Sequence, residues 1–179
     1  FDFYAPPTFL DEYGNRTLIG WMGAPDTEET HKNLTVEYGW QHCLTIPREL
    51  TLKNKKLFQN PHRNLYKLRN GVIIKREYDK NEISSNLICD NMDSYEALII
   101  LENLNNDNNN NFQFIISEGL CGKYKNGKFI LEFINYIGGG RKNRSCYLEY
   151  LNNLRIFVDT SAVEIFINDG EKVFSTRYY

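Results

Sequence analysis

FDFYAPPTFLDEYGNRTLIGWM, residues 1–22, is the stretch that decides the fold. Its aromatic and β-branched residues favour strands, and the polar DEYGN segment between them favours a turn. Pro6 and Pro7 have no backbone N–H to donate to a sheet, so they predict an edge position or a bulge. Gly20 predicts a place where another group closely approaches the backbone. The stretch therefore indicates a hairpin of two antiparallel strands.

A second hairpin follows in the first third of the chain. HCLTIPRELTLK and KLFQNP read as strands on either side of a turn at Asn54 and Lys55. Residues 1–60 thus hold about four short antiparallel strands, which is the content of one propeller blade. The segment HRNLYKLRN has the spacing of a helical turn, and residues 61–70 are interpreted as a linker.

Residues 71–179 alternate strand-like segments with turns that contain Asn and Gly. Short strands at this spacing are typical of a β-sandwich. In AVEIFIND, residues 162–169, apolar and polar residues partly alternate around Glu164, so the pattern predicts a strand with one buried face. Asn-Asp-Gly at 168–170 is a strong hairpin signal, and the Asn-rich stretch 105–111 predicts a solvated loop. The chain is expected to be all-β.

Composition restricts the classes of partner. The 179 residues are 41% hydrophobic and 25% charged, with a formal net charge of -2, which is ordinary for a soluble globular protein. Because there is no basic stripe, nucleic acid is not an expected partner. Because no apolar run approaches the roughly 18 residues of a membrane helix, a membrane is not an expected partner either.

The four cysteines are widely spaced, with no CxxC pair and no His at the spacing of a metal ligand; they are Cys43, Cys89, Cys121 and Cys146. Each has apolar or strand-like neighbours, which predicts reduced thiols in a core. No metal site and no cofactor are expected. Reduced thiols favour a cytoplasmic location.

Two segments of the chain carry a family resemblance. DFYAPPTFLDEYGNRTLIGWMGAPDTEE, continuing to VEYGWQHCLTIPRELTL, and the C-terminal LRIFVDTSAVEIFINDGEKVFSTRYY resemble glycoside hydrolase family 32, in particular its invertase-like β-fructosidases. The resemblance implies the last blade of a five-bladed β-propeller followed by a C-terminal β-sandwich. It also implies that the N-terminal propeller blades are missing from this chain, and that the sandwich, residues 71–179, is clipped at its end.

The resemblance implies retaining hydrolysis that releases β-D-fructosyl units from sucrose, sucrose 6-phosphate or fructans. Such enzymes need two carboxyl groups roughly 5–5.5 Å apart, one as the nucleophile and one as the acid/base. The family places them in WMNDPNG-type and EC motifs, with a further Asp in an RDP motif, and the 179 residues contain no NDPN, no RDP and no EC. No catalytic residue is therefore expected here, and the chain alone is predicted to be inactive.

The remaining candidates are walls of the sugar pocket: Trp21, Asp2 and Tyr4. The Trp21 indole would suit the C–H face of a fructoside, although core packing is an alternative. Asp2 could orient groups of the fructosyl site or only satisfy backbone donors. Glu37, Tyr38, Trp40 and His42 form a cluster in VEYGWQH that could also line the pocket, and blade core with a hydrogen-bonded histidine is the favoured interpretation.

Two readings from other classes stay open. The chain could be a non-catalytic carbohydrate-binding module, or an interaction protein whose sandwich drives formation of a homo-oligomer. The upstream reading frame separates them from the glycosidase, because only the glycosidase needs a WMNDPNG motif there. The sequence leaves open whether the sugar is phosphorylated.

Overall fold

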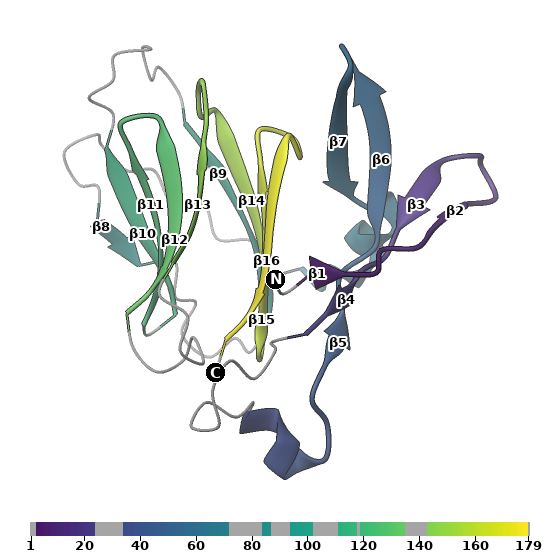
Figure 1. Cartoon of the computed structure of the whole chain (residues 1–179), viewed down its shortest axis with the longest axis horizontal. Coiled ribbons are helices and arrows are strands. Elements are labelled where there is room, and N and C mark those ends of the chain that lie inside the picture. Colours follow the sequence, from purple (N-terminus) through teal and green to yellow (C-terminus); the bar gives the residue numbers. More distant parts are fainter. Residues whose placement is uncertain are drawn as a thin grey trace.

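The computed structural model describes residues 3–23, 34–71, 84–86, 94–101, 111–117, 119–134 and 143–178. Strands dominate this part of the chain, and its helical segments are two short 3-10 turns, η1 (Leu34–Tyr38) and η2 (Arg63–Leu68). The expectation of an all-β fold is confirmed (Figure 1).

The N-terminal part of the chain, residues 3–61, holds two antiparallel sheets and is here called the blade. A four-stranded sheet has the order β2 (Thr8–Leu10), β3 (Arg16–Leu18), β6 (Arg48–Lys53) and β7 (Lys56–Pro61). A three-stranded sheet has the order β1 (Phe3–Tyr4), β4 (Trp21–Met22) and β5 (Cys43–Leu44).

The opening stretch thus splits into two strand pairs, β1 with β4 and β2 with β3. The expectation that residues 1–22 form a single hairpin is therefore wrong. Ala5 adopts a positive φ of 42°, and Pro6 and Pro7, which follow it, cannot donate ladder hydrogen bonds. The chain therefore leaves one sheet at residue 4 and enters the next at residue 8.

The remaining strands form a two-sheet sandwich. One sheet has the order β13 (Asn143–Tyr147), β12 (Lys128–Phe133), β11 (Leu120–Lys125), β10 (Phe112–Ser117) and β8 (Ser84–Asn86). The other has the order β16 (Lys172–Arg177), β15 (Ala162–Ile167), β14 (Asn153–Asp159) and β9 (Tyr95–Ile100). Figure 1 shows the two sheets face to face, with the blade against the outer side of the second.

The sandwich core follows from alternation along the strands. In β12, Phe129, Leu131 and Phe133 are buried while the residues between them are half-buried. In β14 the buried positions are Leu154, Ile156 and Val158. Because successive side chains of a strand point to opposite faces, the two sheets contribute alternate residues to one shared core.

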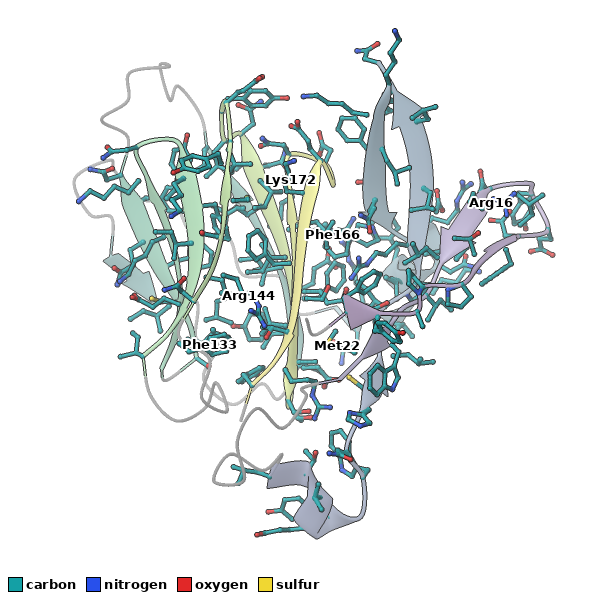
Figure 2. The ribbon with its side chains drawn as sticks, in the orientation of Figure 1. Arg16, Met22, Phe133, Arg144, Phe166 and Lys172 are labelled. Atoms are coloured by element: carbon teal, nitrogen blue, oxygen red, sulfur yellow. The ribbon has the colours of Figure 1, made fainter. Side chains whose placement is uncertain are left out.

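Strand β15 departs from this pattern, because both of its faces are buried. Val163, Ile165 and Ile167 belong to the sandwich core. Glu164 and Phe166, on the opposite face, are also buried, because the blade covers them; Figure 2 shows Phe166 between β15 and the blade strands. The expectation of a single buried face is therefore wrong, and the second face is the contact between the two parts of the chain.

The segment interpreted as a linker contains η2. Its N-cap is His62, whose Nδ1 accepts a hydrogen bond from the Asn64 N–H at 3.2 Å. The exact division into residues 1–60, 61–70 and 71–179 stays a prediction. Residues 102–110, with most of the Asn-rich stretch, lie outside the described residues.

Candidate functional site

A cross-strand row of side chains lies on the three-stranded sheet of the blade. Tyr4 of β1 is directly opposite Trp21 of β4, and Trp21 is directly opposite Leu44 of β5. Directly paired residues project to the same face of a sheet. All three are exposed, Tyr4 to 67%, Trp21 to 39% and Leu44 to 65%. The row therefore forms an open aromatic and apolar surface.

Trp21 is held from two sides. Its ring centroid lies 6.3 Å from that of Tyr4 at an interplanar angle of 73°, and 4.4 Å from that of His42 at 61°. Both are edge-to-face contacts, which favour a fixed ring orientation. Behind the indole, a Cβ added at Gly23 would overlap the Trp21 ring. The indole is thus packed against two rings and beside Gly23, while 39% of Trp21 stays exposed.

The close approach expected at Gly20 is present. A Cβ at this position would overlap the Phe3 ring, so Phe3 occupies the space that a larger residue would need. Phe3 precedes Tyr4 on β1 and points to the other face of the strand. The two glycines on either side of β4 therefore allow rings to pack against its backbone.

The candidates differ in what the structure shows of them. Trp21 and Tyr4 lie together in the row, whereas Asp2 lies outside the described residues. The interpretation of the VEYGWQH cluster as blade core is wrong for Glu37, Tyr38 and Trp40, which are exposed. His42 was assigned to this core, and the structure places its ring against Trp21 instead.

The contact between His42 and Trp21 was not predicted, because blade core was the favoured interpretation of His42. Its Nδ1 is buried and has no hydrogen-bond partner within the part of the chain that the structure describes. The signal that could have found it is the spacing of Trp40, His42 and Leu44, since residues two apart on an extended segment share a face.

A buried polar cluster joins the blade to the sandwich beneath the row. Nη2 of Arg48 donates to Oε2 of Glu164 and to Oγ of Ser175, each at 2.5 Å, and Nη1 donates to Oε1 of Gln59 at 2.9 Å. The Ile46 N–H donates to the other carboxylate oxygen of Glu164 at 2.6 Å. Burial raises the pKa of Glu164, and the charge of Arg48 and these hydrogen bonds act in the opposite direction.

Arg48 also contacts two aromatic rings, one from the blade on the face opposite the row and one from the sandwich. Its guanidinium carbon lies 4.8 Å from the centroid of the Phe3 ring and 5.5 Å from that of Phe166. A guanidinium over an aromatic face is attracted by the ring. Phe3 is therefore packed between the Gly20 backbone and a cation that the sandwich holds in place.

Other carboxylates of the described residues serve the fold. Hydrogen bonds from Asn15 hold the pKa of Asp11 below its usual value. The Arg63 guanidinium lowers the pKa of Glu49. A general acid needs a carboxyl that keeps its proton near neutral pH, so neither group suits that role.

The free thiols expected from the sequence are present at Cys43, Cys121 and Cys146, while Cys89 lies outside the described residues. Within residues 3–178, apart from the undescribed gaps, no three His, Cys, Asp or Glu side chains are grouped as metal ligands. In the same part of the chain no helix has the length and apolarity to cross a membrane.

The chain thus has a blade that carries an exposed aromatic row, followed by a two-sheet sandwich. This arrangement is that of proteins built from a β-propeller and a β-sandwich. The chain belongs to glycosyl hydrolases family 32. Residues 1–61 match the N-terminal domain of that family and residues 136–179 match its C-terminal domain. The resemblance read from the sequence is confirmed.

Relatives of known name cover the whole chain. It is 34% identical over 179 residues to the sucrose-6-phosphate hydrolase of Bacillus subtilis (strain 168) and 39% identical over 187 residues to that of Staphylococcus xylosus, in both cases over 100% of this chain. It spans only 36% and 37% of the length of those relatives.

Solved structures show the same fold. A variant of the Bombyx mori GH32 β-fructofuranosidase in complex with sucrose matches 99% of this chain and 36% of its own, with a TM-score of 0.72 and 23% identity. The sucrose-6-phosphate hydrolase of Lactobacillus gasseri matches 100% of this chain and 37% of its own, with a TM-score of 0.63 and 20% identity. The expected architecture, a last propeller blade followed by a β-sandwich, is thereby confirmed.

Proposed function

We propose that this chain is part of a retaining β-fructofuranosidase that releases β-D-fructosyl units from sucrose, sucrose 6-phosphate or fructans. The observation that carries the proposal is the exposed row in which Tyr4 and Trp21 lie side by side, with His42 against the indole. The family and the names of the relatives support the class of reaction.

In this proposal Trp21 forms one wall of the fructosyl pocket. The C–H groups of a sugar ring would stack on the indole face, and the neighbouring Tyr4 hydroxyl would bond a sugar hydroxyl. Asp2, which precedes Phe3 in the sequence, is included as a third pocket residue on the strength of the family resemblance. The row binds and orients the sugar, and does not itself break the glycosidic bond.

The bond-breaking carboxylates are proposed to come from a part of the protein outside residues 1–179. Retaining hydrolysis needs a carboxylate nucleophile and a carboxyl acid/base roughly 5–5.5 Å apart. The motifs that carry them in family 32 do not occur in this sequence. The pocket would then form where the row of the blade faces those carboxylates.

The proposal also covers the division of the chain into domains and the cellular compartment of the protein. Residues 1–60 are assigned to the last blade, 61–70 to the linker and 71–179 to the sandwich. A cytoplasmic location is proposed because Cys43, Cys121 and Cys146 are free, and disulfides are rare in that compartment.

Fructose release by the full-length protein tests this function. Purified protein is assayed with sucrose, sucrose 6-phosphate and a fructan, and Trp21→Ala is expected to raise KM about tenfold or more, since it removes a contact made in both the bound and the transition state. Tyr147→Ala on β13 is the control, because Tyr147 is also an exposed aromatic residue, 76% exposed, but belongs to the sandwich. A protein that binds fructosides and releases no fructose would support the carbohydrate-binding module instead.

A further inference from the structure

Arg177, the last residue of β16, reaches out of the sandwich into the blade. Its side chain is completely buried. Nε donates to the Ser161 carbonyl at 2.8 Å and Nη2 to the Ser161 hydroxyl at 3.1 Å, which fixes the guanidinium against the turn between β14 and β15. Nη1 points the other way and donates to the Gln41 carbonyl at 3.0 Å. The guanidinium is therefore anchored on one side and holds a blade segment on the other.

The segment that Arg177 holds is residues 40–43. The guanidinium carbon lies 4.8 Å from the centroid of the Trp40 ring, so the same group stacks on Trp40 and bonds to Gln41. It also lies close to Cys43: burial raises the pKa of the Cys43 thiol and the Arg177 charge acts in the opposite direction. Arg177 thus contacts the segment at Trp40 and Gln41, and its charge acts on Cys43.

The same segment carries the ring that packs against Trp21. His42 lies between Gln41 and Cys43, and its ring centroid is 4.4 Å from that of Trp21. Cys43 pairs with Met22, the residue after Trp21, and its thiol is 4.0 Å from the Met22 carbonyl. Each route from Arg177 to Trp21 therefore passes through two residues, Gln41 and His42 on one side and Cys43 and Met22 on the other. Figure 2 shows Met22 in the contact between β16 and the blade.

We propose that Arg177 is a positioning residue for the sugar-binding row: it fixes residues 40–43, and through His42 and Cys43 it sets the orientation of the Trp21 indole. This inference rests on the proposed function, because it gives Trp21 the role of a pocket wall. It assigns to the sandwich a part in substrate binding, although no sandwich residue touches the sugar in this arrangement.

Chemistry explains why an arginine occupies this position. The planar guanidinium presents donors in a fixed fork and an apolar face that stacks on an aromatic ring. A lysine would keep the charge, but it could not bond Ser161 and Gln41 in opposite directions while stacking on Trp40. A shift of the segment by about 1 Å is enough to move a binding group out of its productive place.

The test is a double-mutant cycle in the full-length enzyme, read as KM and kcat for sucrose or sucrose 6-phosphate. Arg177→Met is expected to raise KM about tenfold and to change kcat less than about twofold, because the displaced Trp21 contact is made in both the bound and the transition state. In a Trp21→Ala background the same substitution is expected to change KM less than about twofold, because the residue through which it acts is gone. Arg177→Lys is expected to retain most of the KM defect.

Arg155→Met is the matched control. Arg155 is also an arginine of the sandwich that contacts an aromatic ring outside it, with its guanidinium carbon 4.9 Å from the Tyr66 centroid and Nη1 bonded to the Tyr66 hydroxyl at 3.2 Å. It does not contact residues 40–43 in the described structure. Its loss is expected to change KM less than about twofold.

Each outcome supports or overturns the positioning role of Arg177. Equal KM effects of Arg177→Met in both backgrounds, a loss confined to kcat, or full rescue by lysine would overturn the positioning role and leave the proposed function standing. A Trp21→Ala variant with unchanged KM would overturn the pocket assignment and this inference with it. If Arg177→Met does not fold, Ser161→Ala takes its place in the cycle, because it removes only the hydroxyl acceptor. Its expected KM increase is about threefold, and the same outcomes support or overturn the proposal.

Discussion

Arg48 of β6 and Glu164 of β15 form an ion pair with a distance of 2.5 Å, and their side chains are only 3% and 4% exposed. They are 116 residues apart in the sequence and join the blade to the sandwich. Both ends are further bonded, Arg48 to Gln59 and Ser175, and Glu164 to the Ile46 N–H. The contact between the two parts of the chain therefore has a polar centre in which the two charges are paired, while the buried Nε of Arg48 has no hydrogen-bond partner among the described residues.

Arg48→Met is expected to lower the free energy of unfolding by about 3–5 kcal/mol, because it leaves the Glu164 carboxyl buried without its partner. Urea unfolding followed by circular dichroism measures this. Lys56→Met is the control: it removes the pair with Glu171, in which the Lys56 side chain is 56% exposed, and it should leave stability almost unchanged. The double variant Arg48→Met with Glu164→Leu should recover most of the loss; no recovery would contradict the account.

Gly170→Ala is expected to destabilise the chain more than Gly14→Ala. Both glycines have positive φ, 88° and 80°, so each substitution costs about 1–2 kcal/mol for the backbone conformation alone. At Gly14 a Cβ meets nothing within 4 Å, whereas at Gly170 it would overlap the Gln59 carbonyl of β7. Thermal unfolding of the two variants measures the loss of stability in each. Equal losses would show that the overlap with the Gln59 carbonyl adds nothing to the cost of Gly170→Ala.

Stability is expected to fall in acid partly through Glu96. Burial alone would raise the pKa of Glu96, but hydrogen bonds from Arg69 and Arg155 outweigh it and hold the pKa below the ordinary value of 4.5. A lowered folded-state pKa gives stability that is present above 4.5 and is lost as the pH falls through the folded-state value. The unfolding temperature of Glu96→Gln, measured from about pH 6 to about pH 3, should depend less on pH than that of the unchanged chain. Identical pH profiles of the two proteins would show that Glu96 does not contribute to the loss of stability in acid.

The chain of 179 residues is expected to release no fructose by itself, whereas the full-length protein does. Pocket walls cannot replace the covalent step of a retaining glycosidase. Both preparations are assayed side by side with sucrose and sucrose 6-phosphate, and their folding is checked by circular dichroism. Robust turnover by the chain, free of full-length enzyme, would falsify the assignment of the catalytic carboxylates to another region.

Local features of the fold were predictable because they depend on near neighbours. Asn168, Asp169 and Gly170 were expected to form a hairpin turn, and their φ angles of 49°, 56° and 88° confirm it. The sandwich was predictable from regularly spaced strands and turns. The family resemblance and the aromatic side chains of Trp21 and Tyr4 predict a sugar contact, whereas the face that they share follows only from the pairing of β1 with β4.

Features that depend on distant contacts were not predictable. Glu164 in an alternating strand looks like a residue on a solvated face, and only the blade packed against β15 makes it a buried partner of Arg48. In the same way, a sequence pattern gives no reason to link Arg177 with the carbonyl of Gln41, 136 residues away. Periodicity reports which residues share a face, but it does not report what covers that face.

The separation between these partners has a consequence for how the protein is made. Contacts between residues more than 100 apart close large loops, and such closure slows folding. As the ribosome extends the chain from its N-terminus, Arg48 emerges long before Glu164, Ser175 and Arg177 do. The side of the blade that meets the sandwich must therefore stay open to solvent and chaperones until β15 and β16 leave the exit tunnel. The last strands to be synthesised thus complete the packing of β6, which is synthesised early.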